Sequence, residues 1–302
     1  MAASVPSARV QALAEELDVR LGEIGARYSS VKLASSLAAE DMVLTHAILA
    51  RVTPTAAAAG ATAPSAIAAV GASAATASTG ASTSATAKAA ASVASQSAAQ
   101  PAIGIFTLNT GRLHAETLAM LDRVQARYGY RIEAFEPDAA AVQAYVETQG
   151  LNAFYDSVDL RKQCCAIRKV EPLERALAGV QAWVTGQRRE QSVTRAELHH
   201  EEHDGARGIA KFNPLADWTE AEVWAYLETF DVPVNALHAR GYPSIGCEPC
   251  TRAVRADEDS RAGRWWWESR DSKECGLHTH EVQADAAQVL QSAPQTNSTS
   301  HA

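Results

Sequence analysis

Apolar side chains follow a helical spacing at the start of the chain and a strand-like pattern shortly after it. Over residues 8–28 they recur every three or four positions, which predicts an amphipathic helix. The next apolar run, Val31 to Ala34, has the length of a short strand. A polar turn over residues 35–41 leads into a second helical pattern from Met42 to Ala50. The chain therefore begins as helix, strand, small-residue turn and helix.

The same alternation resumes after residue 100. Strands are expected over residues 103–108, 130–135, 182–185 and 209–212. Helices are expected over residues 114–127, 138–149 and 220–230, and the last of these follows the capping-box sequence Thr219–Glu222. Because strands and helices alternate, we predict an α/β fold with a doubly wound, mostly parallel sheet covered on both faces.

Residues 53–100 interrupt this pattern. The segment is mostly Ala, Ser and Thr, and Lys88 is its only charged residue. With almost no large side chains to bury, it is expected to be a flexible insert, with a transient Ala-rich helix as the alternative. We therefore divide the chain into a domain over residues 1–254, interrupted at 53–100, and a C-terminal tail over 255–302 that has no long periodic run.

The composition narrows the function classes. Apolar residues make up 47% of the 302 residues, enough for a core, and the formal net charge is −8. An acidic chain lacks the positive field that coats nucleic acid or an anionic membrane, so we expect neither partner. The first twenty residues show no secretory signal pattern, and the uncharged residues 52–87 are not apolar enough for a membrane span. We expect a soluble protein of the reducing cytoplasm.

Four of the five cysteines form two close pairs. Cys164 and Cys165 are adjacent at the start of a helical run, and Cys247 and Cys250 form a CxxC in a loop bounded by Gly and Pro. Zinc usually draws its ligands from spaced pairs, whereas a cubane presents four separate irons that each take one thiolate. The pattern favours a [4Fe–4S] cluster over zinc, and redox-active or buried free thiols remain the third reading.

Cys275 is left over from this set. It lies between Lys273 and His278 in a polar segment, and neighbouring cations lower the pKa of a thiol and make it a better nucleophile. On local sequence alone, a reactive nucleophile and a spare exposed cysteine are both open readings.

Basic residues gather in sequence around both cysteine pairs. They occupy positions 161–162, 168–169, 188–189 and 195 near the first pair, and 252, 255, 261, 264 and 270 after the second. In an acidic protein this clustering indicates an anionic substrate, although a solvated, salt-bridged surface is usually the better explanation of any single arginine.

Other site patterns are weaker or missing. The sequence contains no Walker motif and no G-x-G-x-x-G, although the turn over residues 35–41 could hold a phosphate at a helix N-terminus. His199, His200 and His203 have a spacing that could bind a metal ion, but acidic neighbours surround them, and we expect a solvated loop there.

Taken together, these motifs resemble the phosphoadenylyl-sulfate reductase family, and within it the assimilatory adenylyl-sulfate reductases. The matching segments are SSLAAEDMVL, IFTLNTGRLHAETL, CCAIRKVEPLERAL, WVTGQRREQSVTR, GYPSIGCEPCTR, RAGRWWWE and KECGLH. They run from residue 35 to residue 278, and the combination of CC, CxxC and ECGLH is highly specific. The insert at 53–100 and a first loop poorer in glycine depart from the family pattern.

The resemblance implies an adenine-nucleotide-hydrolase-like fold, with the nucleotide at the carboxyl ends of the parallel strands. It implies reduction of adenosine 5′-phosphosulfate to sulfite and AMP in sulfate assimilation, with thioredoxin or a glutaredoxin-like protein as reductant. Cys275 would attack the sulfate sulfur from a mobile catalytic tail, assisted by His278. The implied ligands of a [4Fe–4S] cluster are Cys164, Cys165, Cys247 and Cys250, and the implied substrate-binding residues are Ser36, Lys169, Arg188, Arg261 and Arg264. Homo-oligomer formation stays open.

Three other functions compete with this one. A 3′-phosphoadenylyl-sulfate reductase is the nearest, but members restricted to that substrate typically lack the four cluster cysteines. An ATP-dependent ligase or sulfur transferase of a related fold resembles SGGxDS at the first loop, and SSLAAED lacks the paired glycines. A zinc-binding module without enzymatic activity leaves Cys275 and the arginines unexplained.

Overall fold

The computed structural model describes residues 5–51, 101–192 and 195–268. The predicted catalytic residues Cys275 and His278 therefore lie outside the described residues, as do the insert predicted at 53–100 and the tail beyond Glu268.

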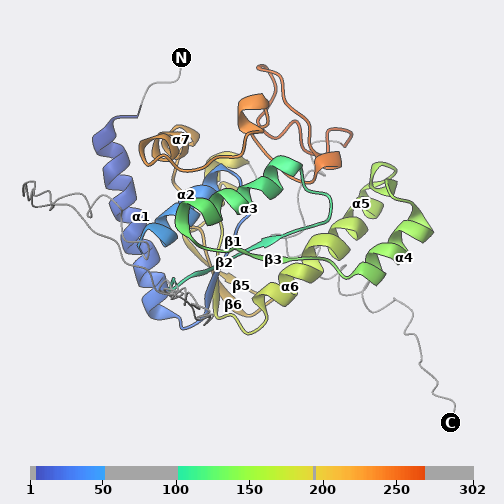
Figure 1. The fold of residues 1–302 in the computed structure, drawn as a ribbon, viewed down its shortest axis with the longest axis horizontal. Coiled ribbons are helices and arrows are strands. Elements are labelled where there is room, and N and C mark those ends of the chain that lie inside the picture. Colours follow the sequence, from blue (N-terminus) through green and yellow to red (C-terminus); the bar gives the residue numbers. More distant parts are fainter. Residues whose placement is uncertain (1–4, 52–100, 193–194, 269–302) are drawn as a thin grey trace, which may run out of the picture.

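A single six-stranded sheet organises these residues, in the order β3-β2-β1-β4-β6-β5 (Figure 1). The strands are β1 (Val31–Ala34), β2 (Gly104–Leu108), β3 (Glu133–Phe135), β4 (Ala182–Val184), β5 (Glu201–Asp204) and β6 (Ile209–Phe212). All neighbours pair in parallel except β5 and β6. The chain moves outward from β1 through β2 to β3 and then crosses back to β4 on the other side of β1. This confirms the predicted doubly wound α/β sheet.

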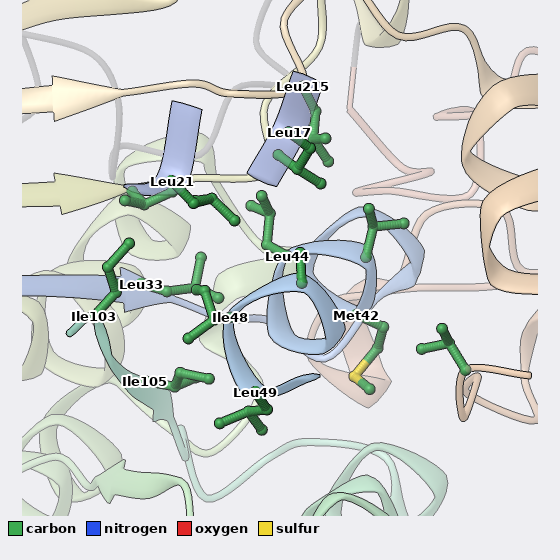
Figure 2. Packing of buried hydrophobic residues seen from close by; sticks show 14 of the residues in the cluster. Leu17, Leu21, Leu33, Met42, Leu44, Ile48, Leu49, Ile103, Ile105 and Leu215 are labelled. Carbon is green, nitrogen blue, oxygen red and sulfur yellow. The ribbon is translucent and has the colours of Figure 1, made fainter. Parts of the chain in front are cut away.

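Alternate residues of the central strands enter two separate cores. On one face, the sheet packs against α1 (Ser7–Arg27), α2 (Ala39–Ala50), α3 (Ala115–Tyr128) and α7 (Glu220–Thr229). Leu33 and Ile105 lie there against Leu44 and Ile48 of α2 (Figure 2). Burial on this scale supplies most of the free energy that holds the helices on the sheet.

The second core is smaller and lies on the opposite face. Phe106 and Trp183, each one residue along from a side chain of the first core, pack there against Leu173 and Leu177 of α6 (Glu171–Leu177). Because both faces are covered, the central strands consist mainly of apolar residues, which is why their sequence pattern could be recognised.

A mainly helical segment joins β3 to the second core. It comprises α4 (Ala139–Gln149), α5 (Val158–Cys165), a π-helical turn (Ala166–Val170) and α6. In Figure 1, α4 and α5 lie to one side of the sheet. α5, the π-helical turn and α6 follow one another without a break. The adjacent cysteines therefore lie inside a helical run, whereas the sequence predicted that they open one. No helix in the described ranges is long and apolar enough to cross a bilayer.

One segment was predicted wrongly. The histidine-rich stretch expected to be a solvated loop contains β5, which pairs antiparallel with β6 and aligns His203 with Ala210. The neighbouring His200 is held by Asp217, which lies 2.5 Å from its Nε2. Antiparallel pairing with β6 therefore gives this charged stretch its strand conformation.

Candidate functional site

A cavity of about 280 Å³ opens at the carboxyl ends of the parallel strands. Its walls come from the segments that follow β1, β2 and β4, including Ser36, Thr110 and Gly186. In open α/β sheets, ligands bind where the direction of strand order reverses, and here that point lies between β1 and β4. The cavity is therefore the candidate binding site.

The loop after β1 is fixed by a buried carboxylate. Asp41 accepts hydrogen bonds from the backbone nitrogen and the hydroxyl of Ser36, both at 2.6 Å. Gly186 of the facing loop lies so close that an added Cβ would come within 2.3 Å of Asp41 Oδ1. Leu37 adopts a φ of 62°, a left-handed conformation that glycine adopts without cost. Leu37 thus takes a glycine-like conformation in the loop that is poorer in glycine than the family pattern.

Burial raises the pKa of Asp41 from 3.8 to about 6. The folded protein therefore holds this proton more tightly than the unfolded chain, and folding loses stability as the pH rises through the window from about 4 to about 6. Asp41→Asn has no titrating group at this position, so its free energy of unfolding should fall by less over this pH window than that of the wild type. The difference between the two falls should reach up to roughly 3 kcal/mol. Urea unfolding of both proteins at the two pH values measures the difference, and an unchanged pH dependence would contradict it.

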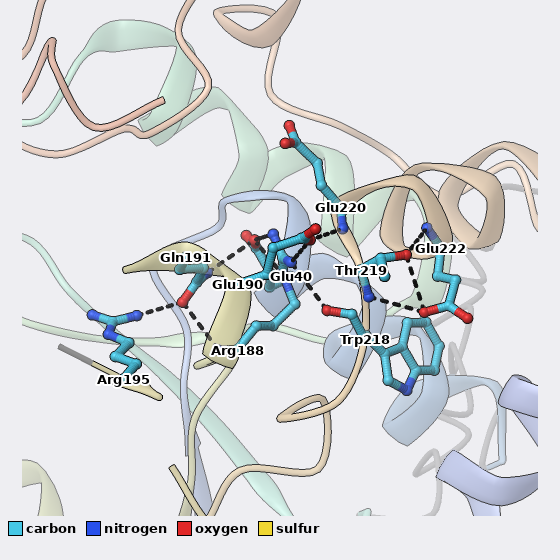
Figure 3. A network of polar contacts seen from close by, with 9 residues as sticks. All are labelled: Glu40, Arg188, Glu190, Gln191, Arg195, Trp218, Thr219, Glu220 and Glu222. Atoms are coloured by element: carbon cyan, nitrogen blue, oxygen red, sulfur yellow. Dashed lines mark hydrogen bonds and ion pairs between the residues drawn. The ribbon is translucent and has the colours of Figure 1, made fainter. Parts of the chain in front are cut away.

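Acidic side chains dominate one part of the cavity. Arg188, itself buried, donates from Nε and Nη2 to Glu40 at 3.0 and 2.9 Å, and from Nη1 to Glu190 at 3.0 Å (Figure 3). Gln191 also donates to Glu40, at 2.9 Å. Glu220 lines the same cavity. The positive charge of Arg188 is therefore balanced within the protein.

Cationic side chains line another part of the cavity. Lys169 of the π-helical turn and Arg261 and Arg264 of the C-terminal segment all face it. Lys169 also lines a second, smaller cavity, and Cys247 belongs to both. An anionic group bound by these cations would therefore lie beside the cysteines.

The second cavity is lined by all four paired cysteines, namely Cys164, Cys165, Cys247 and Cys250. None of the four forms a disulfide. Burial raises the pKa of the Cys250 thiol to about 12 and raises that of Cys164 as well. Thiolates at these positions therefore need a compensating positive group, which a bound metal provides.

The surroundings of these cysteines test which group they could hold. Within the described ranges, no three His, Cys, Asp or Glu side chains converge as they would around one metal ion. The four sulfurs nevertheless face one cavity, which arginines and a lysine surround, including Arg112, Arg168 and Lys169. Four thiols that line one cationic cavity match the ligand count of a four-iron cluster, whose irons take one thiolate each.

All five residues predicted to bind substrate line the first cavity: Ser36, Lys169, Arg188, Arg261 and Arg264. Their roles differ, because both donors of Ser36 are used by Asp41 and the charge of Arg188 is balanced by Glu40. Other basic residues serve the fold instead, as Arg252 does through its ion pair with Glu258.

Sequence reasoning gave no individual role to three residues of this site. Glu40 and Asp41 lie within a quoted motif but carry no distinguishing spacing, and Arg195 appeared only as one of many arginines. All three line the cavity.

Three comparisons agree on where this chain belongs. Residues 73–253 match the family model of the phosphoadenosine phosphosulfate reductase domain. The chain is 63% identical to an adenosine 5′-phosphosulfate reductase of Burkholderia cepacia, over 87% of this chain and 86% of that protein. It is 46% identical to one from Neisseria meningitidis, over 87% and 89% of the two chains.

A solved structure extends the agreement to the fold. The phosphoadenylyl-sulfate reductase of Candida auris superposes with a TM-score of 0.52 and 20% identity, covering 84% of this chain and all of that one. At that identity the likeness concerns the fold alone, whereas the family match and the two bacterial relatives identify the lineage. The chain belongs to the phosphoadenosine phosphosulfate reductase family, among its adenosine 5′-phosphosulfate reductases.

Proposed function

We propose that the protein reduces adenosine 5′-phosphosulfate to sulfite and AMP in sulfate assimilation, with a dithiol protein such as thioredoxin as reductant. The observation that carries the proposal is the cavity at the strand ends, whose cationic residues Lys169, Arg261 and Arg264 suit a phosphosulfate. The relatives named for this activity support the same substrate.

The chemistry uses Cys275, which the sequence supplies from the C-terminal tail. Its thiolate attacks the sulfur of the sulfate group, the bond between that sulfur and the phosphate oxygen breaks, and AMP leaves with the electron pair. A reductant thiolate then attacks Sγ of Cys275 in the S-sulfocysteine, the bond between Sγ and the SO₃ group breaks, and sulfite leaves with the electron pair. A second reductant thiol resolves the mixed disulfide, so the two electrons come from thiols and the reductant ends as a disulfide. His278 assists the nucleophile or the bound sulfate.

Cationic side chains hold the reacting end in place. Lys169, Arg261 and Arg264 neutralise the phosphate and sulfate charges, which keeps the sulfur aligned for attack and stabilises the charge that develops on the leaving phosphate. Cys164, Cys165, Cys247 and Cys250 hold a [4Fe–4S] cluster next to them. When bound, that cluster supplies a fixed geometry and an electrostatic field beside Lys169, and the chemistry needs no electron from it.

Acidic residues give a reason for preferring the substrate without a 3′-phosphate. With the phosphosulfate held by the cationic residues, the rest of the nucleotide extends toward Glu40, Glu190 and Glu220, which would repel another phosphate. The 3′-phosphoadenylyl-sulfate reductase activity is the second candidate, because the cationic side chain of Arg195 lines the same cavity.

Thioredoxin-dependent sulfite release tests both candidates in one preparation. We expect kcat/KM for adenosine 5′-phosphosulfate to exceed that for its 3′-phosphorylated form by on the order of 100-fold. A preference for the 3′-phosphorylated nucleotide would support the second candidate. If neither nucleotide yields sulfite and AMP, the proposed reaction is wrong.

A further inference from the structure

Trp265 lies between the two cavities described above. Its side chain lines the four-cysteine cavity and is 1% exposed, while the preceding residue, Arg264, lines the nucleotide cavity. The indole ring is flanked by two guanidinium groups, with the Arg161 carbon 4.5 Å and the Arg264 carbon 4.7 Å from the ring centroid. Each distance lies within the range of a cation–π contact.

The backbone at Trp265 is also constrained. Its nitrogen donates a hydrogen bond to the carbonyl oxygen of Cys250 at 3.1 Å, and its φ is 40°, in the left-handed region. A bulky residue keeps such a conformation only where its surroundings impose it. Trp265 is thereby tied to the CxxC loop on one side and to Arg264 on the other.

Arg161 is fixed by a buried ion pair. Its Nε lies 2.6 Å from a carboxylate oxygen of Glu268, and the two side chains are 1% and 4% exposed. Arg161 belongs to α5, the helix that also bears Cys164 and Cys165. The Arg161–Glu268 ion pair therefore connects the C-terminal segment to that helix. In the sequence, Cys275 follows Glu268 by only seven residues.

Besides the Trp265 ring, the Arg264 guanidinium contacts the loop over residues 244–246. Its Nη1 donates to the Ser244 hydroxyl at 3.3 Å and to the Ile245 carbonyl at 3.4 Å, both at the long end of hydrogen-bond distances. Its guanidinium passes so close to Gly246 that a Cβ there would come within 2.5 Å of Nη2. Glycine leaves the space for this path, and the indole of Trp265 lies along the guanidinium.

We propose that Trp265 is a positioning residue that aims Arg264 at the anionic part of the nucleotide, with the Arg161–Glu268 pair as its anchor. The inference rests on the proposed function, because it takes Arg264 as an anion ligand. It adds a physical link between the four-cysteine cavity and substrate binding: the same ring contacts the residue that binds the anion and lines the cavity that the cysteines surround.

Equilibrium binding of AMP and of adenosine tests the link without turnover. In Trp265→Leu, AMP should bind about tenfold more weakly while adenosine changes less than about twofold, because only the anion contact is misdirected. Trp265→Phe keeps an aromatic face and should recover most of the AMP affinity. Trp266→Leu is the matched control, since the neighbouring Trp266 is 48% exposed, and it should bind both ligands as the wild type does.

A second variant covers the case in which Trp265→Leu does not fold. Arg161→Met combined with Glu268→Leu replaces the buried ion pair by apolar side chains, an exchange that proteins often tolerate. It should weaken AMP binding by about threefold or more, again sparing adenosine. Equal losses for AMP and adenosine, or unchanged AMP binding in folded variants, would overturn the proposal. If the wild type itself does not prefer AMP to adenosine, the proposed function fails instead.

Discussion

Replacing the predicted nucleophile in Cys275→Ser is expected to lower the rate of sulfite release by on the order of 10⁴-fold or more, because a serine hydroxyl is not ionised near neutral pH and cannot replace a thiolate. The variant should still bind AMP, since the residues that line the cavity in the described part of the chain all precede Glu268. Intact-mass analysis after mixing with substrate measures the covalent step directly: the wild type gains one SO₃ group and the variant gains none.

Cys250→Ser serves as the comparison for this result, because it changes a different thiol. An S-sulfo adduct on Cys275→Ser would show that another residue is the nucleophile and would refute the assignment. Loss of AMP binding in Cys275→Ser would show instead that the C-terminal tail contributes to the nucleotide site.

Cys250→Ser should lose most of the iron that the wild type binds. Anaerobically purified wild type should contain about four irons and absorb broadly near roughly 400 nm, as a cubane with four thiolate ligands requires. We expect sulfite release to fall by about 100-fold or more in the variant, since changes even in the groups that support a metal ligand cost 10- to 100-fold. Iron analysis, the visible spectrum and the rate of sulfite release measure these changes.

Cys275→Ser controls for a general effect of removing a cysteine, because it should keep both the iron and the colour. Stoichiometric zinc without iron in the wild type would favour the zinc-binding alternative. Full iron content in Cys250→Ser would remove that residue from the ligand set.

The central strands could be predicted because they are buried on both faces. Leu33 and Ile105 on one side and Phe106 and Trp183 on the other give runs of apolar residues that no exposed segment would tolerate. The strand over 201–204 escaped prediction because its side chains are almost all charged. Its strand conformation depends on pairing with the neighbouring β6, and this pairing produces no alternating apolar pattern in the sequence of β5 itself.

The candidate site was predictable where chemistry clusters in sequence. Clustering near the cysteines marked many basic positions alike, and the family resemblance selected Lys169, Arg261 and Arg264 among them. Asp41 and Trp265 did not stand out, because their importance lies in contacts across the fold: Asp41 faces Gly186 from another loop, and Trp265 lies over Arg161 of a distant helix. The division of the chain at residue 254 stays a prediction, although Trp265 beyond it is buried.

The charged strand β5 has a consequence for how copies of the protein can assemble. It forms one edge of the sheet, and β6 is its sole strand partner in the described part of the chain. Glu201 and His203 are exposed along it, while Glu202 pairs with Lys211 of β6. A second molecule adding its own β5 there would bring carboxylates against carboxylates, and like charges on paired strands are destabilising. A continuous intermolecular sheet through this edge is therefore disfavoured.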